Sequence, residues 1–432
     1  MKRLICLILC ALFSVSLLPG CGPTEAPETS PSSTAAPAPV SLSVGFGKAD
    51  ITPRAPVPLD GLVSAMDRLS SQVKDPLYTI CIAFTDGADN TFLLIVSDLL
   101  FVYLPLAEAR AEISKTTGIP TSHIWLATTH NHSGPALNES TASIEQTATL
   151  IRNQVIQAAS DALADRKPVS KMYVTDTHPE LFNFVRHYIM SDGSYVGDNF
   201  GSPSGKEYVK HVSEVDNQLQ LVKFTREGGK DVILANWQGH PTGHSQDRYS
   251  ILSGVTLFEE ALEDALDCHA AYVLGASGNV NNSSRILKEQ VTGDYARHYQ
   301  LLAQKAADAA ASFREVKIGN LGFANDDCPC QMKAGGTGTM NIPVGAVSMG
   351  DVAFVFASYE MFDSNGMYVK ENSPFETTFV SSCTNGYNHY IPSEPTFESG
   401  GYEVGKSMVA AGSGEKLAES MVSMLNQLHR GQ

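Results

Sequence analysis

Two histidines lie two positions apart in the segment 128–135, which has the sequence Thr-Thr-His-Asn-His-Ser-Gly-Pro. In an extended chain, residues i and i+2 point to the same side, so His130 and His132 can face one site. The Ser-Gly-Pro that follows them favours a sharp turn. Imidazole nitrogens presented together in this way can bind a metal ion or transfer a proton.

A second pair, His240 and His244, has the four-residue spacing of a helical zinc-binding pair. Pro241 stands where the helical zinc motif has its glutamate base, and Gly243 weakens a helix. We therefore expect His240 in a loop at a strand end and His244 on the surface.

Further polar residues follow other apolar segments. Residues 275–282 (Gly-Ala-Ser-Gly-Asn-Val-Asn-Asn) favour a tight turn whose N–H groups could meet a ligand, although they lack the GxGxxG pattern. Glu360 directly follows an apolar run, so it is expected at a sheet edge with its carboxylate exposed. Two histidines, one glutamate and an open position are typical of a catalytic Zn²⁺ site, where the ion polarises a carbonyl and lowers the pKa of water toward about 7.

The elements that position these residues alternate between apolar and amphipathic segments. Apolar runs such as 92–96 and 353–356 suit strands that are covered on both faces, and ligands of open α/β folds bind at strand ends. The expected fold class is α/β, with mixed central β-sheets flanked by helices in a single large catalytic domain, 41–432. Strands are expected at 41–46, 78–84, 92–97, 123–128, 169–175, 217–224, 231–237, 270–274, 317–323, 352–357 and 376–381. Helices are expected at 104–116, 142–163, 253–266, 288–312 and 405–428. In the last helix, core packing is expected of Met408, Leu417, Met421, Met424 and Leu425.

The composition excludes some classes of protein. The 432 residues are 43% hydrophobic and 18% charged, which is typical of a globular chain. A net charge of −16 repels phosphate backbones, so no nucleic-acid partner is expected. No apolar run of about 20 residues follows residue 20, so no transmembrane helix is expected.

The N-terminal segment has the pattern of an export signal. Lys2 and Arg3 precede an apolar stretch, and residues 18–21 (Leu-Pro-Gly-Cys) resemble a bacterial lipobox. We expect a signal peptide at 1–20, lipidation of Cys21, and a flexible Pro/Ser/Thr/Ala-rich tether to residue 40. This predicts an exported protein anchored to a bacterial membrane, on its periplasmic or cell-surface face; an ordinary secretory signal is the alternative.

The remaining cysteines are expected to be mostly buried thiols, with one disulfide possible: Cys81, Cys268, Cys328, Cys330 and Cys383.

Taken in chain order, the polar motifs of the folded part resemble those of the neutral/alkaline non-lysosomal ceramidase family over roughly residues 43–428. The motifs that carry the resemblance are 44–53 (Val-Gly-Phe-Gly-Lys-Ala-Asp-Ile-Thr-Pro), Ser97-Asp98, 129–135, Asn236-Trp237 with 240–242, 278–281, Glu360, and Asn385, Tyr390 and Tyr402-Glu403. The resemblance implies the zinc ligands His130, His240, Glu360 and Tyr390. It also implies that His132 and Tyr402 contact the substrate, and it makes Arg186 a candidate for the substrate pocket.

Two departures from the family bear on the substrate. Asn281 stands where the family has a serine assigned to catalysis, and Asn279 stands where it has an acid. An asparagine amide is no such nucleophile, but it can donate a hydrogen bond to a carbonyl or oxyanion. Family members that act on ceramide also carry a C-terminal β-sandwich domain, whereas this chain ends just after the catalytic domain.

The expected function is zinc-dependent hydrolysis of the amide bond of an N-acyl, sphingolipid-like substrate by a metal-activated water. The alternatives are a hydrolase of another ester or amide, and a non-catalytic, surface-anchored binding lipoprotein. The expected partners are a small-molecule or lipid substrate and the membrane. The oligomeric state stays open.

Overall fold

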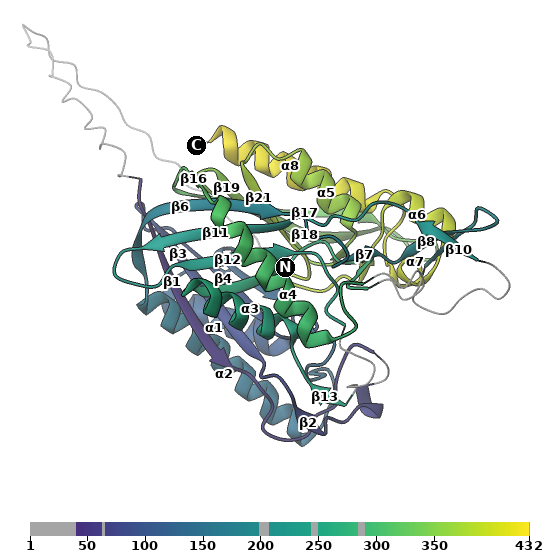
Figure 1. Cartoon of the computed structure of the whole chain (residues 1–432), viewed down its shortest axis with the longest axis horizontal. Helices are drawn as coiled ribbons and strands as arrows, with labels where there is room; N and C mark the ends of the chain where they lie inside the picture. The colour runs from purple at the N-terminus through teal and green to yellow at the C-terminus, as the bar shows by residue number, and fades with distance from the viewer. Residues whose placement is uncertain (1–39, 63–64, 198–206, 243–248, 284–289, 432) are drawn as a thin grey trace, which may run out of the picture. The chain divides into compact units, whose positions relative to one another are not determined.

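A nine-stranded mixed sheet forms the larger of two β layers in the computed structural model (Figure 1). The structure describes residues 40–431 except 63–64, 198–206, 243–248 and 284–289. The expected signal peptide, Cys21, nearly all of the tether and His244 lie outside the described residues. The strand order is β14 (His269–Leu274), β12 (Val232–Trp237), β11 (Leu219–Arg226), β6 (Lys167–Thr177), β1 (Leu42–Asp50), β3 (Tyr78–Asp86), β4 (Thr91–Ser97) and β5 (Ile124–Thr128), with β16 (Arg314–Val316) paired to β6.

A four-stranded sheet packs face to face on the larger one. Its order is β17 (Leu321–Gln331), β18 (Thr339–Met349), β19 (Val352–Ala357) and β21 (Thr377–Ser381). Phe84 and Phe92 of the larger sheet each lie 6.4 Å, centroid to centroid, from the ring of Phe354 in β19. Aromatic side chains from both sheets thus meet in the core between them.

Helices cover the outer faces of both sheets. α1 (Leu104–Thr117) and α2 (Ala142–Ala164) pack near β1, β3 and β5, and α3 (Gly254–Leu266) packs on β14 with α4 (Tyr295–Ala309) beside it. α5 (Asp363–Glu371) and α8 (Ser413–Arg430) cover the smaller sheet. The layers are therefore helix, sheet, sheet and helix (Figure 1), which confirms the predicted fold class.

Short pairings complete the described chain. These are β10 (Tyr208–His211), β8 (His187–Met190) and β9 (Tyr195–Gly197); β13 (Ser250–Ile251) with β2 (Gln72–Val73); β15 (Val280–Asn281) with β7 (Phe184–Val185); and β20 (Glu360–Met361) with β22 (Tyr390–Ile391). The short helices α6 (Glu394–Ser399) and α7 (Tyr402–Lys406) follow β22.

The apolar run in β4 is buried on both faces, as predicted. Phe92, Leu94 and Val96 enter the core between the sheets, whereas Leu93 and Ile95 face the helices. This alternation follows from the two-residue period of a strand. The run in β19 divides in the same way between the inter-sheet core and the core under α8.

The C-terminal helix is shorter than expected. α8 begins at Ser413 because Gly412 has a φ of 79°, a left-handed conformation that separates it from α7. Met408 therefore lies outside the helix and is 40% exposed, so its predicted place in the core is wrong. The core positions are confirmed for Leu417, Met421, Met424 and Leu425.

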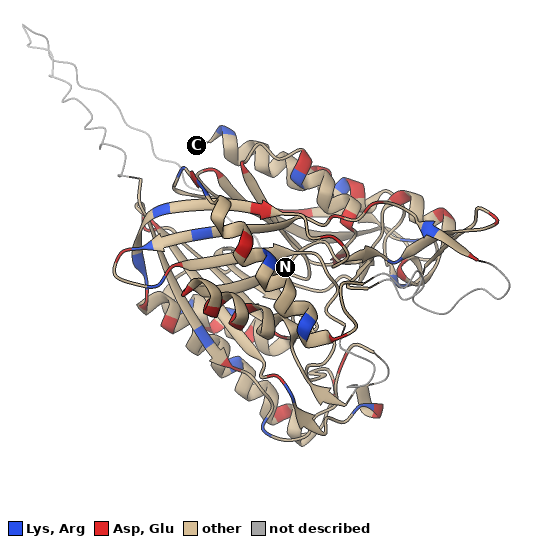
Figure 2. Ribbon diagram, viewed as in Figure 1, with Lys and Arg blue, Asp and Glu red and all other residues tan. Residues whose placement is uncertain are grey.

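The five expected thiols are free and buried. No helix in the described ranges is long and apolar enough to cross a membrane. Figure 2 shows acidic and basic residues close together along the ribbon of α8, whereas α3 carries a run of acidic residues, so part of the net negative charge lies on α3.

One buried histidine makes folding stability sensitive to acid. His298 in α4 packs against Phe182 and Tyr299, and its Nε2 has no hydrogen-bond partner in the described structure. Burial lowers the pKa of His298 from 6.5 to about 4. The unfolded chain therefore takes up a proton at a higher pH than the folded chain, and stability is lost as the pH falls from about 6.5 to about 4.

We expect this histidine to account for about 3 kcal/mol of the acid-induced loss of unfolding free energy. His298→Leu should remove that part of the loss in denaturant unfolding measured from pH 7 to pH 4. His178→Leu is the matched control, because the His178 side chain is 58% exposed. An unchanged pH profile in His298→Leu contradicts the prediction.

Candidate metal centre

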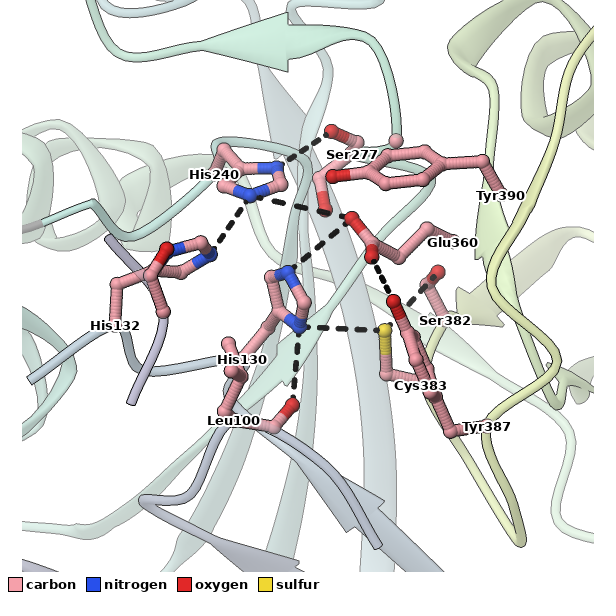
Figure 3. Close-up of polar contacts among 12 residues, drawn as sticks. Leu100, His130, His132, His240, Ser277, Glu360, Ser382, Cys383, Tyr387 and Tyr390 are labelled. Atoms are coloured by element: carbon pink, nitrogen blue, oxygen red, sulfur yellow. Dashed lines mark hydrogen bonds and ion pairs between the residues drawn. The ribbon is translucent and has the colours of Figure 1, made fainter. Parts of the chain in front are cut away.

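Strand ends from both sheets meet at one buried cluster (Figure 3). His130 and His132 follow β5, and His240 follows β12 and forms a bridge with Asn281 in β15. Glu360 opens β20, just after β19, and is the register partner of Tyr390 in β22. Its side chain is only 3% exposed, so the expected exposure of the carboxylate is wrong. The fold thus brings together residues that are separated by up to 260 positions in the chain. His240 lies at a strand end, as predicted.

The turn that carries the first two histidines is anchored by a buried carboxylate. Asp98 accepts hydrogen bonds from Thr129 Oγ1 at 3.1 Å, from Thr256 Oγ1 at 3.0 Å and from the Tyr78 N–H at 3.0 Å. These contacts tie the turn to β3 and α3. His130 has a φ of 59°, a conformation that costs a non-glycine residue about 1 kcal/mol or more and occurs mainly at functional sites.

All three histidines present the same ring nitrogen to the cluster. Nδ1 of His130, His132 and His240 lies 3.0, 2.6 and 3.1 Å from the carbonyl oxygens of Leu100, Gly61 and Ser277, respectively. A carbonyl oxygen only accepts, so each Nδ1 carries the proton and each Nε2 of a neutral ring offers a lone pair. This arrangement of a backbone acceptor behind each ring is typical of metal-ligating histidines.

The Nε2 atoms converge with one carboxylate oxygen. Glu360 Oε2 lies 3.2 Å from His130 Nε2 and 4.0 Å from His240 Nε2, and His240 Nε2 lies 2.9 Å from His132 Nε2. Neither Glu360 Oε2 nor His130 Nε2 has another hydrogen-bond partner in the described chain. His132 Nε2 and His240 Nε2 carry lone pairs that face each other, and a divalent cation bound among these nitrogens and the carboxylate would relieve that repulsion. The residues present therefore fit a metal ion, and the ligand atoms of the three histidines lie within 4.8 Å of one another.

Burial and charge set the protonation of the cluster. Burial opposes a charge on His130, but Glu360 beside it raises the pKa of His130 well above the ordinary value, so a metal ion would displace the proton of this ring. Burial lowers the pKa of His132 and of His240 well below the ordinary value, and the charge at His130 lowers both further, so both rings are neutral at pH 7. Burial also opposes a charge on Glu360, but His130 beside it brings the pKa of Glu360 below its ordinary value. Neutral imidazole and ionised carboxylate are the forms that bind metal.

The second oxygen of Glu360 is held by a tyrosine that the sequence analysis did not single out. Tyr387 Oη donates to Glu360 Oε1 at 2.9 Å, and the Tyr387 ring stacks on Phe101 with centroids 3.7 Å apart. Burial raises the pKa of Tyr387, so the hydroxyl keeps its proton. The tyrosine therefore leaves Oε2 as the oxygen that faces the histidines.

We expect Tyr387→Phe to weaken metal affinity by about 10-fold to 100-fold, the usual cost of removing a group that orients a ligand. Competition with a metal-sensitive dye would measure the change. Tyr368→Phe serves as the control, because Tyr368 lies on α5 with 41% of its surface exposed. Equal affinity in the wild type and Tyr387→Phe would show that Glu360 needs no such support.

The other predicted site residues surround Tyr390. Arg186 Nη2 donates to Tyr390 Oη at 3.3 Å and Arg186 Nη1 donates to Asn281 Oδ1 at 3.4 Å. The Tyr402 ring packs edge-on against the Tyr390 ring at 5.6 Å. The structure thus brings Arg186, Asn281, Tyr390 and Tyr402 together beside the cluster.

Two more residues of this region were given no role by the sequence analysis. Glu403 and His187 are buried behind Arg186, and Glu403 binds both side chains. Glu403 stands next to Tyr402 in the resemblance motif, and this was the signal that could have identified it. His187 had no such signal, because a single histidine after an arginine has no distinguishing pattern.

Comparison with known proteins identifies solved structures with a similar fold. No protein-family model and no curated protein matches the sequence. A solved structure of a ceramidase complexed with C2 superposes with a TM-score of 0.72 and 14% identity, over 91% of this chain and 76% of that one. The neutral ceramidase from Pseudomonas aeruginosa gives a TM-score of 0.71 and 14% identity, over 90% of this chain and 75% of that one. At this identity the likeness shows a ceramidase-like fold.

Proposed function

We propose that this protein is a zinc-dependent hydrolase that cleaves the amide bond of an N-acyl, sphingolipid-like substrate. The observation that carries the proposal is the convergence of the His130 and His240 Nε2 atoms on Glu360 Oε2 in a buried cluster. The proteins that share the fold are ceramidases by name, which supports an N-acyl lipid as the substrate class.

His130, His240 and Glu360 would hold the ion, with Tyr390 as the fourth ligand. Imidazole and carboxylate in this number suit zinc. When bound, zinc supplies a Lewis acid that polarises a carbonyl and lowers the pKa of water toward about 7. His132 lies next to these proposed ligands but is not one of them, and its Nε2 faces His240 Nε2.

Arg186 and Asn281 are the donors for a substrate carbonyl. The Asn281 Oδ1 atom accepts a hydrogen bond from Arg186. The two N–H donors on Asn281 Nδ2 therefore point away from Arg186. Fixed donors stabilise the negative charge that develops on a carbonyl oxygen during attack. Asn281 thus acts by hydrogen bonding, and the proposed reaction needs no nucleophilic side chain at this position.

His132 is the group that moves the proton. Its Nδ1–H is held by the Gly61 carbonyl, so Nε2 can accept a proton and deliver it to the leaving amine. Tyr402 is half-buried against Tyr390 and would contact the substrate beside the scissile bond.

The test uses the purified full chain in detergent, loaded with one equivalent of zinc. We expect release of fatty acid from a short-chain N-acylsphingosine, with less from the matched ester. Faster cleavage of the ester or of a non-lipid amide would assign the alternative substrate class. Bound metal with no turnover of any acyl substrate would favour a binding protein and contradict the proposal.

We also propose that the protein is exported and anchored through a lipid on Cys21. Metabolic labelling with a clickable fatty acid should mark the wild type but not Cys21→Ser. Equal labelling of both would contradict the lipobox assignment.

A further inference from the structure

A buried network of charged side chains lies directly behind the proposed substrate donors. Arg186 lies between β7 and β8, and Glu403 lies in α7. Arg186 Nε donates to Glu403 Oε1 at 2.8 Å, and His187 Nε2 lies 3.1 Å from Glu403 Oε2. The Arg186 and Glu403 side chains are only 3% and 2% exposed.

The contacts of Arg186 account for most of its hydrogen-bonding capacity. A guanidinium has five N–H donors in a fixed plane. Nε donates to Glu403, and Nη1 donates to Asn281 Oδ1 at 3.4 Å. Nη2 donates to the Gly278 carbonyl at 2.8 Å and to Tyr390 Oη at 3.3 Å. One Nη1 proton is left on the side of the guanidinium that carries Asn281.

The Glu403 carboxylate is itself held from the opposite side. The Tyr195 hydroxyl lies 2.6 Å from His187 Nδ1, so His187 is fixed between Tyr195 and Glu403. Although burial opposes ionisation, Arg186 and His187 hold the pKa of Glu403 down to about 2. The carboxylate is therefore charged at neutral pH.

Burying such a pair is expensive. Desolvation costs several kcal/mol per ion, and the attraction between the partners often only offsets it. Stability alone is a weak reason to keep the pair. The geometry supplies a better one. Among the described residues, the one side-chain carboxylate bonded to Arg186 binds Nε and leaves the Nη atoms for Tyr390 and Asn281.

We propose that Glu403 is a positioning residue, which fixes the plane of the Arg186 guanidinium so that its Nη atoms face the Tyr390 and Asn281 side of the metal centre. This inference rests on the proposed hydrolase function, in which Arg186 donates to the substrate carbonyl. Without the carboxylate, the guanidinium can rotate about its last side-chain bonds and the donor moves away from the reacting atoms.

The test is a double-mutant cycle with Glu403→Gln and Arg186→Ala in the zinc-loaded full chain. We expect Glu403→Gln to retain one metal per chain and to lower kcat by about 10-fold to 100-fold with a smaller change in KM, as expected for a misplaced group near the reaction. In the Arg186→Ala background, Glu403→Gln should have no further effect. Losses that multiply in the double mutant would overturn the proposal, as would wild-type kcat in Glu403→Gln. Glu398→Gln, at an exposed position in α6, is the matched control.

A second readout does not depend on turnover. The buried Arg186 Nε–H should give a slowly exchanging signal in ¹H–¹⁵N spectra of arginine-labelled protein, assigned by its loss in Arg186→Lys. We expect Glu403→Gln to shift or broaden that signal and Glu398→Gln to leave it unchanged. An unchanged signal in Glu403→Gln would overturn the positioning role. If no acyl substrate is cleaved but the signal responds as expected, the proposed function fails while the Glu403–Arg186 coupling stands. If Glu403→Gln does not fold, Glu403→Asp provides the same comparisons with a shorter carboxylate.

Discussion

Replacing His130 with alanine is expected to remove the bound metal and, with it, all measurable hydrolysis. His130 Nε2 faces Glu360 Oε2 at 3.2 Å, and the side chain is 1% exposed, so no nearby group or bulk water can replace the ligand atom without rearrangement. Wild-type protein should contain about one zinc per chain after dialysis, and His130→Ala about none. Elemental analysis and fatty-acid release on the same samples measure both effects.

Two controls make this result specific. His178→Ala removes an exposed histidine and should change neither metal content nor activity. His132→Ala tests the alternative ligand set, because His132 also belongs to the three-histidine cluster. Retained zinc with reduced turnover supports His132 as the proton-transfer group, whereas lost zinc makes it a ligand. Full activity in His130→Ala would refute the site.

Gly47→Ala is expected to cost about 3 kcal/mol or more of unfolding free energy, the upper range for overpacking a core. A Cβ at Gly47 would lie 2.1 Å from the Ala158 carbonyl oxygen and 2.8 Å from the Ala162 nitrogen, both in the backbone of α2. Backbone atoms within a helix cannot move aside as a flexible side chain can. Either β1 and α2 must separate, or the sheet must bend.

The measurement is the midpoint of denaturant unfolding, compared between the wild type and the variant. Gly405→Ala is the matched control, because a Cβ there meets no atom within 4 Å. Gly45→Ala should behave like Gly47→Ala, since its Cβ would lie within van der Waals overlap of the Ala162 carbonyl oxygen. A midpoint for Gly47→Ala equal to that of Gly405→Ala would show that β1 and α2 can separate at little cost.

These two glycines give a physical reason for a motif that the sequence analysis used only for its resemblance. Gly45 and Gly47 lie on one face of β1, two positions apart, and allow α2 to approach the sheet closely. Val44 and Phe46 lie on the other face and enter the core between the sheets. One short segment therefore sets the spacing of two layers.

The sequence by itself determined the local features of this protein. The sequence placed His130 and His132 together after a strand, although His130 has a φ of 59° and not the extended backbone that was expected. Apolar runs identified β4 and β19 as strands buried on both faces. Pro241 excluded a helical zinc pair and left His240 in a loop. Such features depend on neighbours in the chain, so residue order is enough to predict them.

Only the tertiary structure decided how distant side chains meet. Tyr387 holds Glu360, and Glu403 holds Arg186 from 217 positions away, because β20 pairs with β22 and the fold brings Glu403 of α7 against Arg186 and His187. No period or spacing in the sequence encodes those distances. The direction of each ring nitrogen was also undetermined, because it depends on which backbone carbonyl lies behind each histidine once the strands have packed.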